Sequence, residues 1–205
     1  IAGVITSIMA DRIAMGKKVL LLLTLLLAAS YTGVFFLLDH VHVDFDKFDS
    51  VMSLGAKVLV VFSGLVVPFF LSGLILSILF TNHAAQFGKL YFWDLVGASI
   101  GCLLVPLLIP AFGGPGLLFV ASGFALVAMS LQVQSKFLKW GAVGSALAVS
   151  CFQLFLGSDY LEISYHMDKR GFRTLQAASQ GTYWDRISRI DLIQYRAEYV
   201  WIAYD

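Results

Sequence analysis

The chain is short of charge. Only 13% of its 205 residues are Asp, Glu, Lys or Arg, whereas 59% are hydrophobic, and its mean hydropathy is +0.84. Soluble domains are nearer half apolar and a quarter charged, so this composition excludes an ordinary water-soluble domain for most of the chain. The net charge of +1 also lacks the basic excess of nucleic-acid-binding proteins. We therefore expect no nucleic-acid partner.

Cysteine is scarce as well. Cys102 and Cys151 are the two cysteines, and both lie in apolar stretches without the CxxC or Cys/His spacing of a zinc site. We interpret both as small residues of the helix core. The glycine-rich stretch 113–116 is not preceded by a strand or followed by GK[ST]. It therefore predicts a tight turn and not a phosphate-binding loop.

Long uncharged runs take the place of the missing charge. About 20 apolar residues cross the hydrocarbon layer as a helix. We predict an α-helical multi-span membrane bundle over residues 1–157, with five to six crossings. The predicted spans are 1–10 (the end of a helix), 19–38, 58–80, 90–112, 117–133 and 141–156. Pro68 should kink its span, and Pro106 and Pro110 should bend or end theirs.

The last quarter of the chain is more polar, since about half of all charged residues follow Leu156. Residues 189–196 and 198–204 have the composition of two strands joined by a tight connection. We therefore predict that 158–205 is the start, hairpin-like, of a soluble α/β domain. The sequence begins at Ile1 inside an apolar run and stops at Asp205 just after one, so we expect it to be part of a longer protein.

Basic residues of short loops predict orientation, because they are enriched on the cytoplasmic side. One set of alternate loops carries six of them, and the other set carries two, Lys47 and Lys57, among several acids. The six are Arg12, Lys17, Lys18, Lys89, Lys136 and Lys139. The tail lies outside if 141–156 crosses the membrane and inside if it turns back. The loop charges slightly favour outside.

Two features of the central span are candidates for function. Asp94 is an acid within an apolar run, and such acids are costly in lipid and usually paired. It could serve a substrate or a proton, or it could lie at the interface, satisfied by Lys89 or by backbone donors at the start of the helix. Gly97 and Gly101 have the four-residue spacing that lets helices approach closely in membranes, so we predict that they pack helices together.

A third candidate lies in the polar segment after the first full span. His40, His42, Asp44 and Asp46 alternate with apolar residues, so an extended chain would place all four on one face. Imidazole and carboxylate groups suit a divalent metal ion. The alternative is a solvated acidic loop on the non-cytoplasmic side.

The order of several motifs resembles the membrane half of bacterial spermidine-synthase-like proteins. The resemblance covers roughly residues 1–205, and its most specific part is the central fifty residues. It rests on Asp11-Arg12, Pro68-Phe69-Phe70-Leu71-Ser72-Gly73-Leu74, Lys89-Leu90-Tyr91-Phe92-Trp93-Asp94-Leu95-Val96-Gly97-Ala98, Gly101-Cys102-Leu103-Leu104 and Gly113-Gly114-Pro115-Gly116. Residues 184–190 are similar to the opening of that family's soluble domain, with Asp185 and Arg186 where the family often has Asn and Ser.

The resemblance implies a multi-pass protein of the bacterial inner membrane that anchors a polyamine-aminopropyltransferase-like domain. Its cofactor would be decarboxylated S-adenosylmethionine if the family activity is retained. The catalytic residues would lie beyond Asp205, so the resemblance assigns no catalytic or cofactor-binding residue here. Two other classes stay open: a non-catalytic helical subunit of a larger membrane assembly, and a transporter-like bundle. The expected partners are the lipid bilayer and either other membrane proteins or a second copy of the chain.

Overall fold

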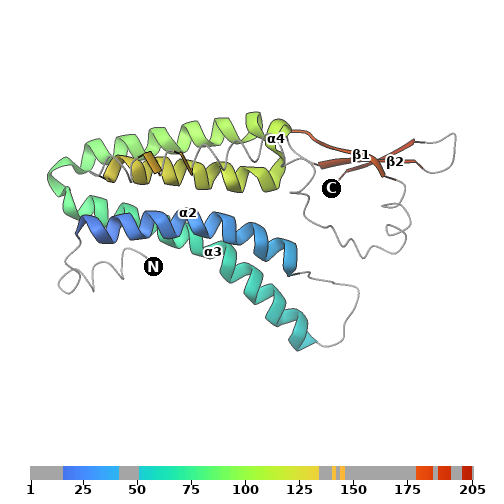
Figure 1. Ribbon diagram of the computed structural model, residues 1–205, viewed down its shortest axis with the longest axis horizontal. Helices are drawn as coiled ribbons and strands as arrows, with labels where there is room; N and C mark the ends of the chain where they lie inside the picture. Colours follow the sequence, from blue (N-terminus) through green and yellow to red (C-terminus); the bar gives the residue numbers. More distant parts are fainter. Residues whose placement is uncertain are drawn as a thin grey trace.

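The architecture was obtained as a computed structural model, which describes three long helices, one short helix and three strands (Figure 1). The helices are α2 (Lys17–His40), α3 (Val51–Asn82), the 3-10 helix η1 (Ala84–Gln86) and α4 (Phe87–Gln132). The strands are β1 (Ser179–Trp184), β2 (Arg189–Gln194) and β3 (Val200–Tyr204). The described residues are 16–41, 51–133, 140–141, 144–145, 179–186, 189–194 and 200–204.

The three long helices are apolar enough and long enough to cross a membrane. The 24 residues of α2 extend over about 36 Å, more than the roughly 30 Å of hydrocarbon in a bilayer. The prediction of long apolar helices that can cross a membrane is therefore confirmed, and the predicted spans 19–38 and 58–80 lie within longer helices. Spans 1–10 and 141–156 fall outside the described residues, apart from two short helical pieces at 140–141 and 144–145.

Proline does not interrupt α3. Pro68 is buried, and the helix continues through it. Figure 1 shows that α3 bends along its length, as expected for a helix that contains a proline. The first turns of α3 therefore lean away from α2.

The segment called α4 is a hairpin of two helical arms. Gly113 has φ 67° and ψ 167°, which is not helical, and the chain reverses there so that the two arms run side by side (Figure 1). That region of conformational space is almost restricted to glycine. Pro115 follows in the first turn of the second arm, where its missing N–H costs nothing. The predicted tight turn at 113–116 and the two predicted spans on either side of it are thus present.

Helix α2 lies between α3 and the second arm of α4 and contacts both. Phe35 of α2 packs against Phe119 of α4, with ring centroids 5.1 Å apart. Towards the start of α2, the hydroxyl of Ser122 donates a hydrogen bond to the carbonyl of Ala28 at 2.9 Å. On its other side, Leu37 of α2 fills the space beside Gly64 of α3.

Polar side chains form hydrogen bonds along the contact between α2 and α4, although the bundle is otherwise apolar. Further towards the start of α2, Gln132 Nε2 donates to Thr24 Oγ1 at 3.1 Å, and Thr24 in turn donates to the carbonyl of Leu20 at 2.8 Å. Thr24 and Ser122 are each 3% exposed. Lipid tails are as apolar as leucine, so packing and interhelical hydrogen bonds associate helices in membranes. These contacts fix the register of α2 on α4.

The three strands form an antiparallel sheet in the order β1-β2-β3. Tyr183 pairs with Ile190 across β1 and β2, and Ile193 pairs with Trp201 across β2 and β3. A bulge lies between Ser179 and Gly181. The strands predicted at 189–196 and 198–204 correspond to β2 and β3, whereas β1 was not predicted. That the sheet belongs to a soluble α/β domain stays a prediction.

We predict that Ser122→Ala weakens the bundle because it removes the hydrogen bond to Ala28. The expected loss in the free energy of unfolding is about 0.6 kcal/mol and at most about 1.7 kcal/mol, the range for such bonds in membranes. Unfolding in bicelles by titration with a denaturing detergent measures it.

Ser99→Ala is the matched control, because the Ser99 hydroxyl bonds only to Leu95 of its own helix at an exposed position. It should leave the free energy of unfolding unchanged. Equal losses for the two variants would contradict a stabilising contact between α2 and α4 at Ser122.

Candidate functional site

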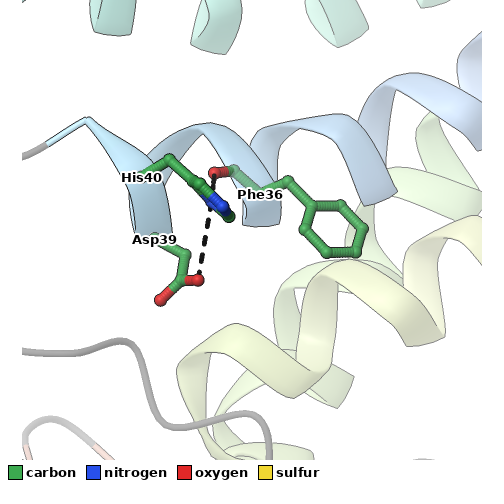
Figure 2. A network of polar contacts seen from close by, with 3 residues as sticks. All are labelled: Phe36, Asp39 and His40. Carbon is green, nitrogen blue, oxygen red and sulfur yellow. Dashed lines mark hydrogen bonds and ion pairs between the residues drawn. The ribbon is translucent and has the colours of Figure 1, made fainter.

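The predicted metal site cannot begin as an extended segment at His40, because this residue belongs to the last turn of α2. Its Nδ1 lies 2.9 Å from the carbonyl oxygen of Phe36 (Figure 2). A carbonyl can only accept, so Nδ1 carries the hydrogen and donates it. At His40 the chain is therefore helical and not extended, and the metal-binding face of His40, His42, Asp44 and Asp46 otherwise stays a prediction. His42, Asp44 and Asp46 lie outside the described residues.

Asp39 lies next to His40, with Oδ2 3.6 Å from His40 Nδ1 (Figure 2). The side chain of His40 is 73% exposed, so this pair is screened by solvent and contributes little to stability. Within the described segments, no group of three or more His, Cys, Asp or Glu side chains could hold a metal ion.

Asp94 is half-buried on the first arm of α4. In the described part of the chain it forms no ion pair with Lys89, so the interfacial pairing considered above is not found there. The proposed role of Asp94 in binding a substrate or a proton stays a prediction.

Gly97 and Gly101 contact no other helix among the residues that the structure describes. A Cβ atom built at either glycine meets no atom within 4 Å. The predicted spans 1–10 and 141–156 lie almost wholly outside the described residues, so the packing of helices on this face stays a prediction.

The end of the bundle where α2 begins contains a pocket of about 460 Å³. Three chain segments meet there: the start of α2, the end of α3 and the end of α4. The polar side chains of the lining are Lys17, Asn82, His83 and Gln132. Its apolar side chains are Leu20, Leu79, Leu131 and Val133, and Gly16 completes it. None of these side chains is acidic.

Hydrogen bonds order two of the polar residues of the pocket. Gln132 Nε2 is directed to Thr24 Oγ1, and the carbonyl of Ala128 lies 3.5 Å from the same nitrogen. His83 closes the end of α3, where its backbone N–H donates to the carbonyl of Leu79 at 3.1 Å. Its ring Nδ1 lies 3.2 Å from the same carbonyl. Gln132 Oε1 is buried and has no hydrogen-bond partner among the described residues.

At the opposite end of the bundle, the sheet touches the reversal of α4. The indole of Trp184, the last residue of β1, lies against Gly113 and Gly114. A Cβ atom on Gly113 would be 3.0 Å from Trp184 Nε1, and one on Gly114 would be 3.0 Å from Cη2 and Cζ3. Such distances are shorter than ordinary van der Waals contact. The two glycines thus form a surface without side chains, and the indole packs on it. We call this contact of Gly113, Gly114 and Trp184 the indole seat.

Sequence reasoning did not predict the pocket or the indole seat. The lining of the pocket comes from positions as distant as 16 and 133, and no sequence motif connects them. The sequence did single out the residues of the indole seat, because Gly113-Gly114 and Trp184 both belong to the stretches on which the family resemblance rests. Nothing in the sequence indicated that they touch.

No family model, curated protein or solved structure matches this chain. The fold itself fits a multi-pass membrane protein, because three of the described helices are long and apolar enough to cross a membrane. In this protein a three-stranded sheet contacts one end of the bundle, and a pocket lies at the other.

We predict that alanine at either seat glycine destabilises the protein, for different reasons. Gly113→Ala forces a side chain into a conformation with positive φ, at a cost on the order of 1–3 kcal/mol. Gly114→Ala instead presses its Cβ atom against the indole. Thermal unfolding in detergent should show both losses.

Two comparisons separate these causes. In a Trp184→Ala background, Gly114→Ala should lose its effect, whereas Gly113→Ala should keep most of it. Gly97→Ala and Gly101→Ala, which introduce a methyl group into open space, should be neutral. Seat variants as neutral as these two controls would contradict the close contact.

Proposed function

We propose that this chain is the membrane domain of a spermidine-synthase-like protein, and that it anchors an aminopropyltransferase-like tail at one end of its helix bundle. The observation that supports anchoring most directly is the indole seat. It joins the sheet of the tail to the turn between the two arms of α4. The identity of the tail rests on the resemblance of residues 184–190 and of the central motifs.

The two ends of the bundle differ in charge. Lys17 lies at the end of the bundle that contains the pocket, as does the connection between α3 and α4. Lys18 is in the first turn of α2, and Lys89 is in the first turn of α4, at the same end. Asp39 lies at the far end of α2, and the sheet contacts the α4 reversal at that same end (Figure 1). Basic residues mark the cytoplasmic side. We therefore infer that the sheet lies on the non-cytoplasmic side.

This orientation limits the chemistry that the tail can perform. Aminopropyl transfer in the family uses decarboxylated S-adenosylmethionine, which is a cytoplasmic nucleotide cofactor. A tail outside the membrane does not meet that cofactor. The proposal therefore assigns to these helices an anchoring and positioning role and assigns no catalytic residue in this chain.

One observation favours a second candidate, a helical subunit that docks onto another membrane protein. Gly97 and Gly101 leave a surface of small residues open on the first arm of α4. Small residues allow close approach between helices in lipid. This role is compatible with anchoring, since the indole seat lies at the end of that arm.

The anchoring proposal predicts that Trp184→Ala frees the sheet from the bundle. Amide hydrogen exchange of the protein in nanodiscs should become faster in β1, because the contact that orders this strand is lost. The helices should keep their protection.

Tyr183→Ala is the matched control. Tyr183 precedes Trp184 on the same strand but is 60% exposed, so its removal should change exchange in β1 much less. Anchoring through the indole seat is wrong if the two variants accelerate exchange equally, or if Trp184→Ala leaves exchange in β1 unchanged.

A further inference from the structure

The pocket at the start of α2 is divided into a polar and an apolar part. Lys17 and His83 belong to the ends of their helices, whereas Leu20 and Leu79 lie about one turn further inside. Along α2 and α3 the lining therefore changes from polar to apolar in the direction of the membrane centre, while the Gln132 amide of α4 is turned inward to Thr24. A ligand that matches it has a charged or polar end followed at once by an apolar part.

The depth of the pocket agrees with this division. Helix α2 has 24 residues, so its length of about 36 Å exceeds the roughly 30 Å of hydrocarbon. Its first residue, Lys17, then lies at the level of the lipid headgroups. The leucines one turn further inside lie at the level where acyl chains begin.

The charge of the pocket is positive. Lys17 contributes an ammonium group, and none of the lining residues is acidic. Helix α2 begins at Gly16 without a side-chain cap. Its first-turn N–H groups and the positive end of the helix dipole therefore add to the attraction for an anion. The absence of a side chain at Gly16 also leaves room for a ligand near the backbone.

We propose that this pocket binds one anionic phospholipid of the phosphatidylglycerol class. The phosphate lies against Lys17 and the start of α2, and the glycerol backbone and upper acyl chains lie against Leu20, Leu79 and Leu131. A soluble phosphate compound would use the same cation but would leave the leucines uncovered. Basic pockets between helices on the cytoplasmic side are common sites for anionic headgroups. The inference does not depend on the aminopropyltransferase-like identity of the tail.

Native mass spectrometry of the full chain in detergent tests the proposal, with phosphatidylglycerol and phosphatidylcholine added separately. The protein should retain one phosphatidylglycerol molecule in preference to phosphatidylcholine. Lys17→Gln should lower the affinity for phosphatidylglycerol about fivefold, the effect of one basic residue near an anionic headgroup. Lys17 is exposed, so this variant should fold normally, as its melting temperature can verify.

Lys18→Gln is the matched control, since Lys18 is the exposed neighbour of Lys17 and does not line the pocket. It should leave the affinity almost unchanged. Equal retention of the two lipids would overturn an anionic site, and equal effects of the two lysine variants would overturn its location. Displacement of the lipid by millimolar glycerol phosphate would show that the ligand is a soluble phosphate and overturn the lipid assignment.

Discussion

The contact between α2 and the second arm of α4 aligns the two ends of the described helix bundle. In lipid the two helices gain nothing by hiding apolar side chains, so specific contacts must set their register. The Ser122 hydroxyl donates to the carbonyl of Ala28, the Gln132 amide donates to Thr24, and the ring of Phe35 packs at a tilt against that of Phe119. These contacts align the start of α2 with the end of α4, and the end of α2 with the α4 reversal.

Both candidate sites follow from that alignment. At one end it brings Lys17 beside Gln132 and the last residues of α3, and the pocket forms between them. At the other end the reversal at Gly113 presents two glycines without side chains, and the indole of Trp184 occupies the space. One end of the bundle thus has basic residues and the pocket, and the other end contacts the sheet.

Composition predicted the class of the fold well, because uncharged runs of about 20 residues have few alternatives to crossing a membrane. The turn at 113–116 was predictable because glycine and proline cluster there. Helix α2 continues to His40, two residues beyond the predicted span 19–38, because a single residue at the start of an alternating stretch carries too little of the pattern to set the end of a helix.

The pocket and the indole seat could not be predicted, because both depend on how distant segments align. Gly97 and Gly101 show the reverse difficulty: their spacing indicated packing, but none of the described helices packs on them. A sequence pattern describes what a helix face can accept and does not identify its partner. The spermidine-synthase-like resemblance stays a prediction.

The most direct test of the account is side-specific labelling of a single cysteine at Asp185, an exposed residue just after β1. The background is Cys102→Ser and Cys151→Ser, which removes the exposed thiol of Cys102. A membrane-impermeant maleimide applied to intact cells should label Asp185→Cys, because the sheet lies opposite the basic end of the bundle. Labelling only after lysis would place the sheet in the cytoplasm. That result would contradict the proposed orientation and make aminopropyl transfer by the full-length protein the next reaction to assay.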